Sequence, residues 1–176
     1  SNCFTGSHII DALLENPSNE VVGISRSPEY EPLFLPYKRH DNPRFEFRRI
    51  DLVRQFDELI RSLQEIQPQV VINVAALSEV ALSHERPAEY FDTNTLGVVR
   101  LCDHLRRCAY LERYVHISSA EIFGTCPTPL TEAAPFRPST PYAISKAAAD
   151  MYLSTLQDNF DFPVTIIRST NVYGHH

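Results

Sequence analysis

Val70-Val71-Ile72-Asn73-Val74 is the stretch that decides the fold of this chain. It is a short run of mostly β-branched residues. Its apolar residues do not alternate with polar ones, which is typical of a strand that is buried on both faces. Segments with the apolar spacing of helices lie on either side of it. The pattern therefore predicts a parallel sheet that is covered by helices on both faces.

The same alternation continues along the chain in both directions. Short apolar runs take turns with segments in which apolar residues recur every three or four positions. We therefore expect one doubly wound α/β domain over residues 1–176. The expected helices are 9–15, 56–66, 88–108 and one that begins near Tyr142, and the expected strands are 20–24, 45–50, 70–74, 114–118 and 163–168.

The composition is that of a globular domain, with 43% hydrophobic and 22% charged residues. A net charge of −6, without arginine-rich runs, argues against a nucleic-acid partner or an anionic membrane surface. No apolar run reaches the roughly 18 residues that span a bilayer. The four cysteines show no C-x-x-C spacing, which argues against a metal site and a disulfide framework and favours the cytoplasm.

Tyr142-Ala143-Ile144-Ser145-Lys146 places a phenol and an ammonium four residues apart in a segment predicted to be helical. At this spacing both side chains project from one helix face. A neighbouring cation lowers a tyrosine pKa that is otherwise about 10, so we expect the pair to transfer protons. Such pairs also occur on solvated helices. However, Ser119 supplies a hydroxyl at the end of the preceding strand, and the chain has only two lysines.

The segment Cys3-Phe4-Thr5-Gly6 directly precedes a helical pattern. A helix N-terminus with exposed backbone N–H groups is where the pyrophosphate of a dinucleotide binds. With a single glycine, the segment also fits an ordinary helix start.

Together with Tyr142, Lys146 and Ser119, this loop makes the whole chain similar to the extended short-chain dehydrogenase/reductase family, the NAD(P)-dependent nucleotide-sugar epimerases and dehydratases. The resemblance implies a Rossmann-type fold, a nucleoside-diphosphate sugar as substrate and a homodimer. In that family the loop reads G-x-x-G-x-x-G; Gly6 matches the third glycine and Cys3 stands at the second. We therefore expect a fragment of a longer enzyme, without the first strand and the C-terminal substrate lobe.

The resemblance assigns further residues to the cofactor. Asp51 follows the strand 45–50, where relatives bond the adenine amino group, although an Asp there also suits a helix cap. Asn94 matches an asparagine that steadies the site. The expected cofactor contacts are Cys3, Phe4, Thr5, Gly6, Ser25, Arg26, Asp51, Leu52, Val74, Ala75, Ala76, Asn94, Tyr142 and Lys146.

The end of the second strand of the family fold separates NAD from NADP. An acid there binds the ribose 2′-hydroxyl, whereas a basic residue accommodates a 2′-phosphate. Here Ser25 and Arg26 occupy the position, which favours NADP. In the alternative, Arg26 stacks on adenine while NAD binds.

The segment Ser118-Ser119-Ala120-Glu121 resembles the family motif that precedes the reaction centre. In 4,6-dehydratases of the family, the acid at the Glu121 position removes the C5 proton, whereas 4-epimerases usually lack it. The resemblance therefore favours a nucleotide-sugar 4,6-dehydratase, with a 4-epimerase, a decarboxylase or a non-catalytic cofactor-binding module as alternatives. The expected catalytic residues are Ser119, Glu121, Tyr142 and Lys146, the expected substrate contacts are Ser78, Ser119, Ala120 and Asn171, and no metal ligand is expected.

Overall fold

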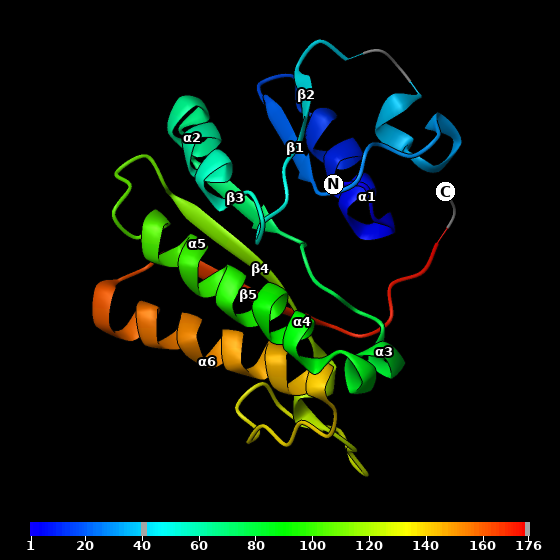
Figure 1. The fold of residues 1–176 in the computed structure, drawn as a ribbon, viewed down its shortest axis with the longest axis vertical. Coiled ribbons are helices and arrows are strands. Elements are labelled where there is room, and N and C mark those ends of the chain that lie inside the picture. Colours follow the sequence, from blue (N-terminus) through cyan, green and yellow to red (C-terminus); the bar gives the residue numbers. More distant parts are fainter. Residues whose placement is uncertain (40–41, 175–176) are drawn as a thin grey trace. The chain divides into compact units, whose positions relative to one another are not determined.

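The computed structural model describes residues 1–39 and 42–174, so residues 40, 41, 175 and 176 of the expected domain lie outside the description. The chain divides into two compact units, which Figure 1 shows with their helices and strands labelled. The first unit comprises Ser1–Arg61 and the described residues 172–174, and the second comprises Ser62–Asn171.

The first unit packs one helix against a two-stranded parallel sheet. Its core consists of Ile10 and Leu14 from the helix and of Leu35 and Tyr37 from the segment between the two strands, with Phe45 beside them. Strand β1 pairs with β2 in the register Val21↔Phe45 to Ser25↔Arg49. The elements are α1 (Phe4–Leu14), β1 (Val21–Ser25), two short 3₁₀ turns (Pro32–Phe34 and Pro36–Lys38) and β2 (Phe45–Arg49).

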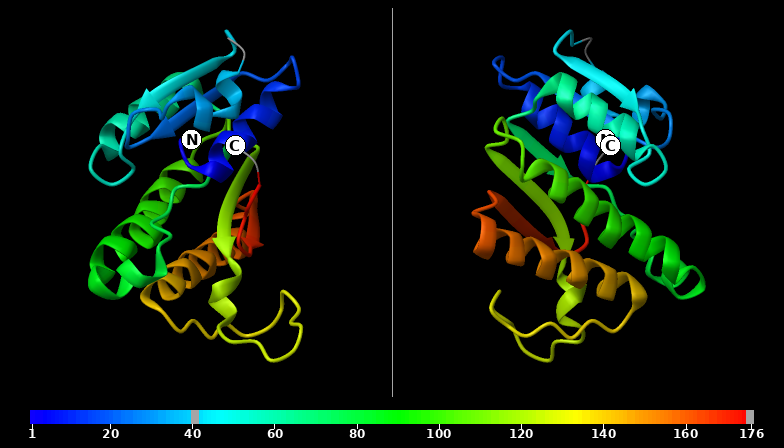
Figure 2. Two further views of the ribbon diagram at one scale, coloured as in Figure 1. Left: turned by 90° about the vertical axis from the view of Figure 1, so that its right-hand side faces the viewer. Right: turned by 60° about the vertical axis from the view of Figure 1, so that its left-hand side comes forward.

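The second unit is built on a three-stranded parallel sheet of order β3-β4-β5. Helices α5 and α6 lie side by side over one face of this sheet (Figure 2). Buried side chains of both helices, such as Leu105 and Leu153, form its core together with Tyr114 of β4. The elements are β3 (Val70–Asn73), α3 (Val80–Glu85), α4 (Pro87–Phe91), α5 (Gly97–Leu105), β4 (Arg113–Ser119), α6 (Pro141–Phe160) and β5 (Val164–Ser169), and α2 (Phe56–Ile66) crosses the boundary between the units.

All strand pairs are parallel, as the sequence predicted, but the five strands lie in two sheets. The first unit holds the two-stranded sheet of order β1-β2, and the second unit holds the three-stranded sheet of order β3-β4-β5.

The expected helix 88–108 is not regular. It consists of α4, a π-helical turn over Asp92–Leu96, and α5, which ends at Leu105. A π-helical turn holds one extra residue per turn and is frequent at functional sites. The strand expected over 70–74 ends at Asn73, because the Asn73 side-chain oxygen accepts a hydrogen bond from Ala75 N and turns the chain.

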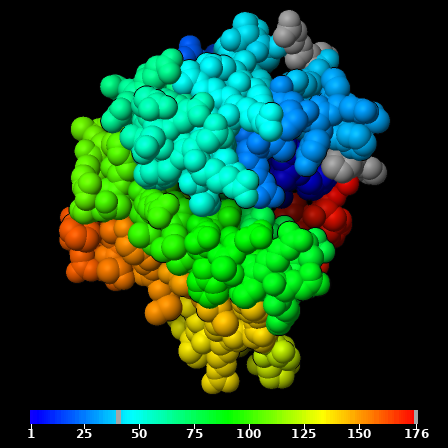
Figure 3. All heavy atoms as spheres, in the orientation of Figure 1, coloured from blue at the N-terminus to red at the C-terminus, as the bar shows by residue number. Residues whose placement is uncertain are grey.

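The segment between β4 and α6 has no regular helix or strand beyond the 3₁₀ turn Ala120–Phe123. Figure 3 shows part of it at the surface of the second unit, beside the start of α6. Gly124 directly follows this 3₁₀ turn with a φ of 68°, and a Cβ atom there would lie 2.2 Å from Arg137 O. A glycine is therefore required at this turn.

Candidate active site

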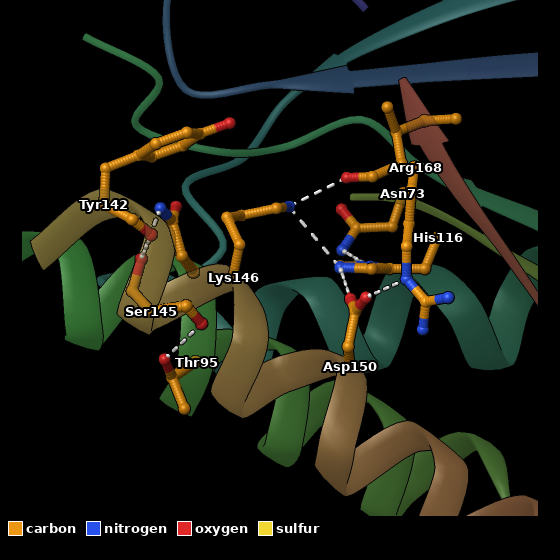
Figure 4. Close-up of polar contacts among 10 residues, drawn as sticks. Asn73, Thr95, His116, Tyr142, Ser145, Lys146, Asp150 and Arg168 are labelled. Atoms are coloured by element: carbon orange, nitrogen blue, oxygen red, sulfur yellow. Dashed lines mark hydrogen bonds and ion pairs between the residues drawn. The ribbon is translucent and has the colours of Figure 1, made fainter. Parts of the chain in front are cut away.

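Helix α6 carries the predicted Tyr142 and Lys146. The Thr140 hydroxyl accepts a hydrogen bond from Ala143 N, and Pro141 occupies the first helical position, so the helix starts immediately before Tyr142. Tyr142 and Lys146 project from the same side of α6 (Figure 4). Their exposed fractions are 8% and 1%, so both polar groups lie in a largely dry environment.

The Lys146 ammonium is directed at the end of β4. Its Nζ donates a hydrogen bond to Ile117 O over 2.8 Å and lies 3.4 Å from His116 Nε2. Burial lowers the pKa of Lys146 to about 8, while the negative charge of Asp150 raises it.

The pKa of Tyr142 differs from the sequence expectation. Burial raises this pKa, hydrogen bonding with the Ser119 hydroxyl lowers it, and the charges of Glu121 and Tyr90 raise it further. The prediction that Lys146 makes the pKa of Tyr142 lower than usual is wrong for this structure, because the ammonium binds Ile117 O instead. Tyr90 packs edge-on against the Tyr142 ring at a centroid distance of 6.4 Å.

Ser119 and Glu121 lie where β4 ends. The Ser119 Oγ accepts a hydrogen bond from Glu121 N over 3.2 Å, which caps the 3₁₀ turn Ala120–Phe123. Ser119 is buried, whereas Glu121 is exposed and Ala120 is half-buried. The structure thus places Ser119 and Glu121 near Tyr142, close enough for the Ser119 hydroxyl and the Glu121 charge to act on the phenol.

Asn94 joins the π-helical turn to two other elements. Its Oδ1 accepts from Leu77 N over 2.8 Å, and its Nδ2 donates to Leu77 O over 2.9 Å and to Ser145 Oγ over 3.0 Å. Thr95 Oγ1 donates to Ser145 O over 2.9 Å. The fully buried Asn94 thereby fixes the turn after β3 against α6, one residue from Lys146.

The remaining residues predicted for the second unit lie at its surface or beside β3. Val74 and Ala76 are half-buried, and Ala75 is exposed and donates to Asn73 Oδ1. Ser78 and Asn171, predicted to contact the substrate, are both exposed.

The predicted pyrophosphate loop forms the start of α1 in the first unit. The helix begins at Phe4, earlier than the predicted residue 9, because Cys3 Sγ accepts a hydrogen bond from Gly6 N. A Cβ atom at Gly6 would lie 3.0 Å from Ser1 O and 3.2 Å from Ser1 Cα. Gly6 therefore allows Ser1 to lie close to α1. Cys3 and Thr5 stand next to this close contact in the chain.

Two further predicted cofactor positions follow the strands of the first unit. Arg26 comes directly after Ser25, is exposed, and its carbonyl oxygen accepts from Arg49 Nε over 3.1 Å. Asp51 Oδ1 accepts from the backbone N–H groups of Val53 and Arg54 over 2.8 and 2.9 Å. Asp51 therefore caps the turn into α2, as the alternative interpretation of the sequence predicted, while Leu52 beside it is half-buried.

Sequence reasoning missed the buried polar groups around Lys146. His116 and Asp150 are both fully buried, and Asp150 binds Arg168 over 2.9 Å. The available signals were the position of Asp150 four residues after Lys146 and that of His116 shortly before Ser119. A strand residue and a helix residue cannot be matched from spacing alone, so the cluster was not predicted.

Over residues 1–176, the sequence matches the family described as NAD dependent epimerase/dehydratase. The chain belongs to this family. A UDP-glucose 4-epimerase from Mycolicibacterium smegmatis is 33% identical over 175 residues, which are 97% of this chain and 54% of that protein. A dTDP-glucose 4,6-dehydratase from Neisseria meningitidis is 29% identical over 184 residues, which cover 97% of this chain and 51% of that protein.

The fold of this family member agrees with solved structures. The crystal structure of a UDP-glucose 4-epimerase from Thermus thermophilus in complex with NAD matches with a TM-score of 0.85 and 32% identity. The match covers 98% of this chain and 54% of that chain. The predicted Rossmann-type fold is confirmed, and the chain spans about half the length of the relatives it matches.

No helix in the described part of the chain combines the length and apolar character needed to cross a bilayer. Within residues 1–39 and 42–174, no group of three or more His, Cys, Asp or Glu side chains is placed to hold a metal ion.

Proposed function

We propose that this protein is a nicotinamide-dinucleotide-dependent 4,6-dehydratase. It would remove water from a nucleoside-diphosphate sugar and give a 4-keto-6-deoxy product. The observation that carries the proposal is the exposed carboxylate of Glu121, which follows Ser119 at the end of β4 and acts electrostatically on Tyr142. Proton abstraction at C5 needs a base of this kind beside the groups that oxidise C4.

The start of α1 supports binding of the dinucleotide. A Cβ atom at Gly6 would meet Ser1 O at 3.0 Å, so the backbone is closely folded here, and the helix N-terminus presents N–H groups to an anion. Cys3, Phe4, Thr5 and Gly6 would hold the pyrophosphate, and Ser25, Arg26, Asp51 and Leu52 the adenosine. When bound, the dinucleotide supplies the acceptor for a hydride from C4 and the donor of a hydride to C6.

The residues of the second unit would divide the proton transfers. Tyr142 would take the proton of the C4 hydroxyl, and Ser119 would hydrogen-bond the C4 oxygen. The stem of Lys146 would lie beside the nicotinamide ribose, and its ammonium would hold that ribose. Glu121 would then remove the C5 proton, which the C4 ketone makes acidic. The C6 hydroxyl would take a proton from solvent, because Ala120 offers no acid, and leave as water. Glu121, after exchange with solvent, would return a proton to C5.

Val74, Ala75, Ala76 and Asn94 would form the cofactor wall after β3, and Ser78, Ala120 and Asn171 would contact the sugar nucleotide. The homodimer and the cytoplasmic location stay predictions.

A 4-epimerase is the second candidate, because relatives that cover 97% and 98% of this chain carry that activity. Epimerisation needs Tyr142, Lys146 and Ser119 to oxidise C4 but needs no base at C5. Glu121 therefore separates the two candidates.

The test is the pair Glu121→Gln and Tyr142→Phe in the full-length enzyme, assayed with a panel of sugar nucleotides. We expect Glu121→Gln to keep reduction of the cofactor by substrate while release of a 4-keto-6-deoxy product slows ~10²–10⁴-fold. Tyr142→Phe should suppress both steps. A Glu121→Gln enzyme with near-wild-type turnover would contradict the dehydratase proposal.

We further propose NADP as the preferred cofactor, because the exposed Arg26 follows Ser25 where a 2′-phosphate would lie. Solved relatives bound to NAD make NAD the alternative.

A further inference from the structure

His116, Asp150 and Arg168 form a largely buried polar cluster beside Lys146. The proposed reaction does not use this cluster. Asp150 follows Lys146 by one turn of α6 and is fully buried, and its Oδ2 accepts from Arg168 Nε of β5 over 2.9 Å. His116 of β4 is also fully buried, with its Nε2 3.4 Å from Lys146 Nζ and 4.0 Å from Asp150 Oδ1. Figure 4 shows Asp150 pointing toward both His116 and Arg168.

The turn after β3 fixes the orientation of His116. Asn73 Oδ1 accepts from Ala75 N, so the Asn73 amide nitrogen faces His116 Nδ1 at 3.4 Å. An amide NH₂ group and an ammonium both donate, and a neutral imidazole has one acceptor nitrogen, so His116 accepts from either Asn73 or Lys146 and not from both. Burial, together with the charge of Lys146, lowers the pKa of His116 to about 3, which keeps the ring neutral.

The second oxygen of Asp150, Oδ1, lies on the side of His116. Among the residues that the structure describes, Asp150 Oδ1 has no hydrogen-bond partner. Arg168 is partly exposed and also lies over the rings of Phe123 and Phe136, at 5.7 and 5.1 Å from their centroids. Arg168 therefore anchors one oxygen of Asp150 while the other oxygen faces His116.

We propose that Asp150, held by Arg168, is a positioning residue for Lys146: its negative charge keeps the buried ammonium protonated and directed at Ile117 O. The part that Lys146 plays in turnover rests on the proposed function, but the charge state of Lys146 does not.

Geometry carries this inference: Asp150 follows Lys146 by one turn of α6, and His116 Nε2 lies 3.4 Å from Lys146 Nζ and 4.0 Å from Asp150 Oδ1. Removing an ammonium from water favours the neutral amine, whereas an anion within about 4–6 Å favours the charged form. Burial and Asp150 act on the pKa of Lys146 in these opposite directions. Of the groups on the packed elements, His116 is neutral and Arg168 is cationic. Tyr142, with Tyr90 and Glu121 near it, is a further titratable group, and burial raises its pKa.

Two substitutions break the same ion pair and change the charge near Lys146 in opposite directions. Asp150→Asn removes a negative charge, and Arg168→Gln removes a positive one. The titration of Lys146 is followed by NMR of ¹³Cε-labelled lysine in the full-length protein, with the signal assigned from Lys146→Met. We expect Asp150→Asn to lower the midpoint by about 1–3 pH units, and Arg168→Gln to leave it unchanged or raise it.

Two controls complete the experiment. Asp158→Asn removes an exposed carboxylate from the same helix and should leave the midpoint unchanged, and Asp150→Glu should keep the wild-type midpoint because it keeps the charge. If Asp150→Asn leaves the midpoint unchanged, or if both ion-pair variants lower it, the proposal is wrong. If Asp150→Asn does not fold, a lowered midpoint in Arg168→Gln still overturns it.

The NMR readout separates this proposal from the proposed function. An inactive enzyme with the expected midpoints would contradict the function alone. In an active enzyme, the alkaline limb of the kcat profile should move to lower pH in Asp150→Asn, because the Lys146 cation is lost at lower pH.

Discussion

Replacing Asn94 with Ala should destabilise the second unit strongly. The substitution deletes three hydrogen bonds of 2.8, 2.9 and 3.0 Å and leaves Leu77 N and Leu77 O without their partner. Each bond contributes about 0.5–1.5 kcal/mol, and each polar group left unpaired in a buried place costs about 1–3 kcal/mol. Since the fully buried Asn94 site admits little water, we expect a loss of about 3–5 kcal/mol in the free energy of unfolding.

Urea denaturation followed by far-UV circular dichroism measures this loss. Asn159→Ala is the matched control, because the exposed Asn159 amide on α6 makes one hydrogen bond, to Thr155 O over 2.9 Å. The control should cost no more than about 1 kcal/mol. A loss below about 1 kcal/mol for Asn94→Ala would refute the reasoning that Asn94 holds the turn after β3 to α6.

Two further predictions address Lys146 and Arg26. The pKa of buried Lys146 is about 8, below its ordinary value of 10.5, so the unfolded chain binds more protons between these values and the free energy of unfolding rises with pH there. Lys146→Met should remove this rise, whereas Lys38→Met, at an exposed lysine, should keep it. Urea denaturation from about pH 7.5 to 10 measures the rise. Equal pH dependence in wild type and Lys146→Met would contradict the buried ammonium. Arg26→Ala should weaken NADP binding by about 1–3 kcal/mol, the loss of a charge-assisted contact, with NAD little affected; equal losses for both cofactors in calorimetry would exclude Arg26 as the phosphate ligand.

The fold could be predicted from the sequence because short strand-like runs take turns with segments of helical spacing. Val70 to Asn73 and the β4 run ending at Ser119 are two of these runs, and both form parallel strands of one sheet. The end of β3 and the π-helical turn at Asn94 could not be predicted, because both depend on side-chain hydrogen bonds to distant residues. Local spacing predicts which face of a helix or strand a residue occupies, but not which residue it contacts there.

The candidate site, too, could be predicted from the sequence only in part. Tyr142 and Lys146 share one helix face, as their spacing predicted. The direction of the Lys146 ammonium could not be predicted from the sequence, because it depends on Ile117 O and His116 of β4. These contacts arise only when α6 packs on the sheet, so the pKa of Tyr142 could not be judged from the spacing.

The reaction itself is tested most directly in D₂O. The full-length enzyme is incubated with its sugar nucleotide, and the products are identified by mass spectrometry and NMR. If Glu121 acts as a base at C5, the product is a 4-keto-6-deoxy sugar with one solvent deuterium at C5. A product inverted at C4 and free of deuterium at C5 would contradict the dehydratase account and leave the 4-epimerase.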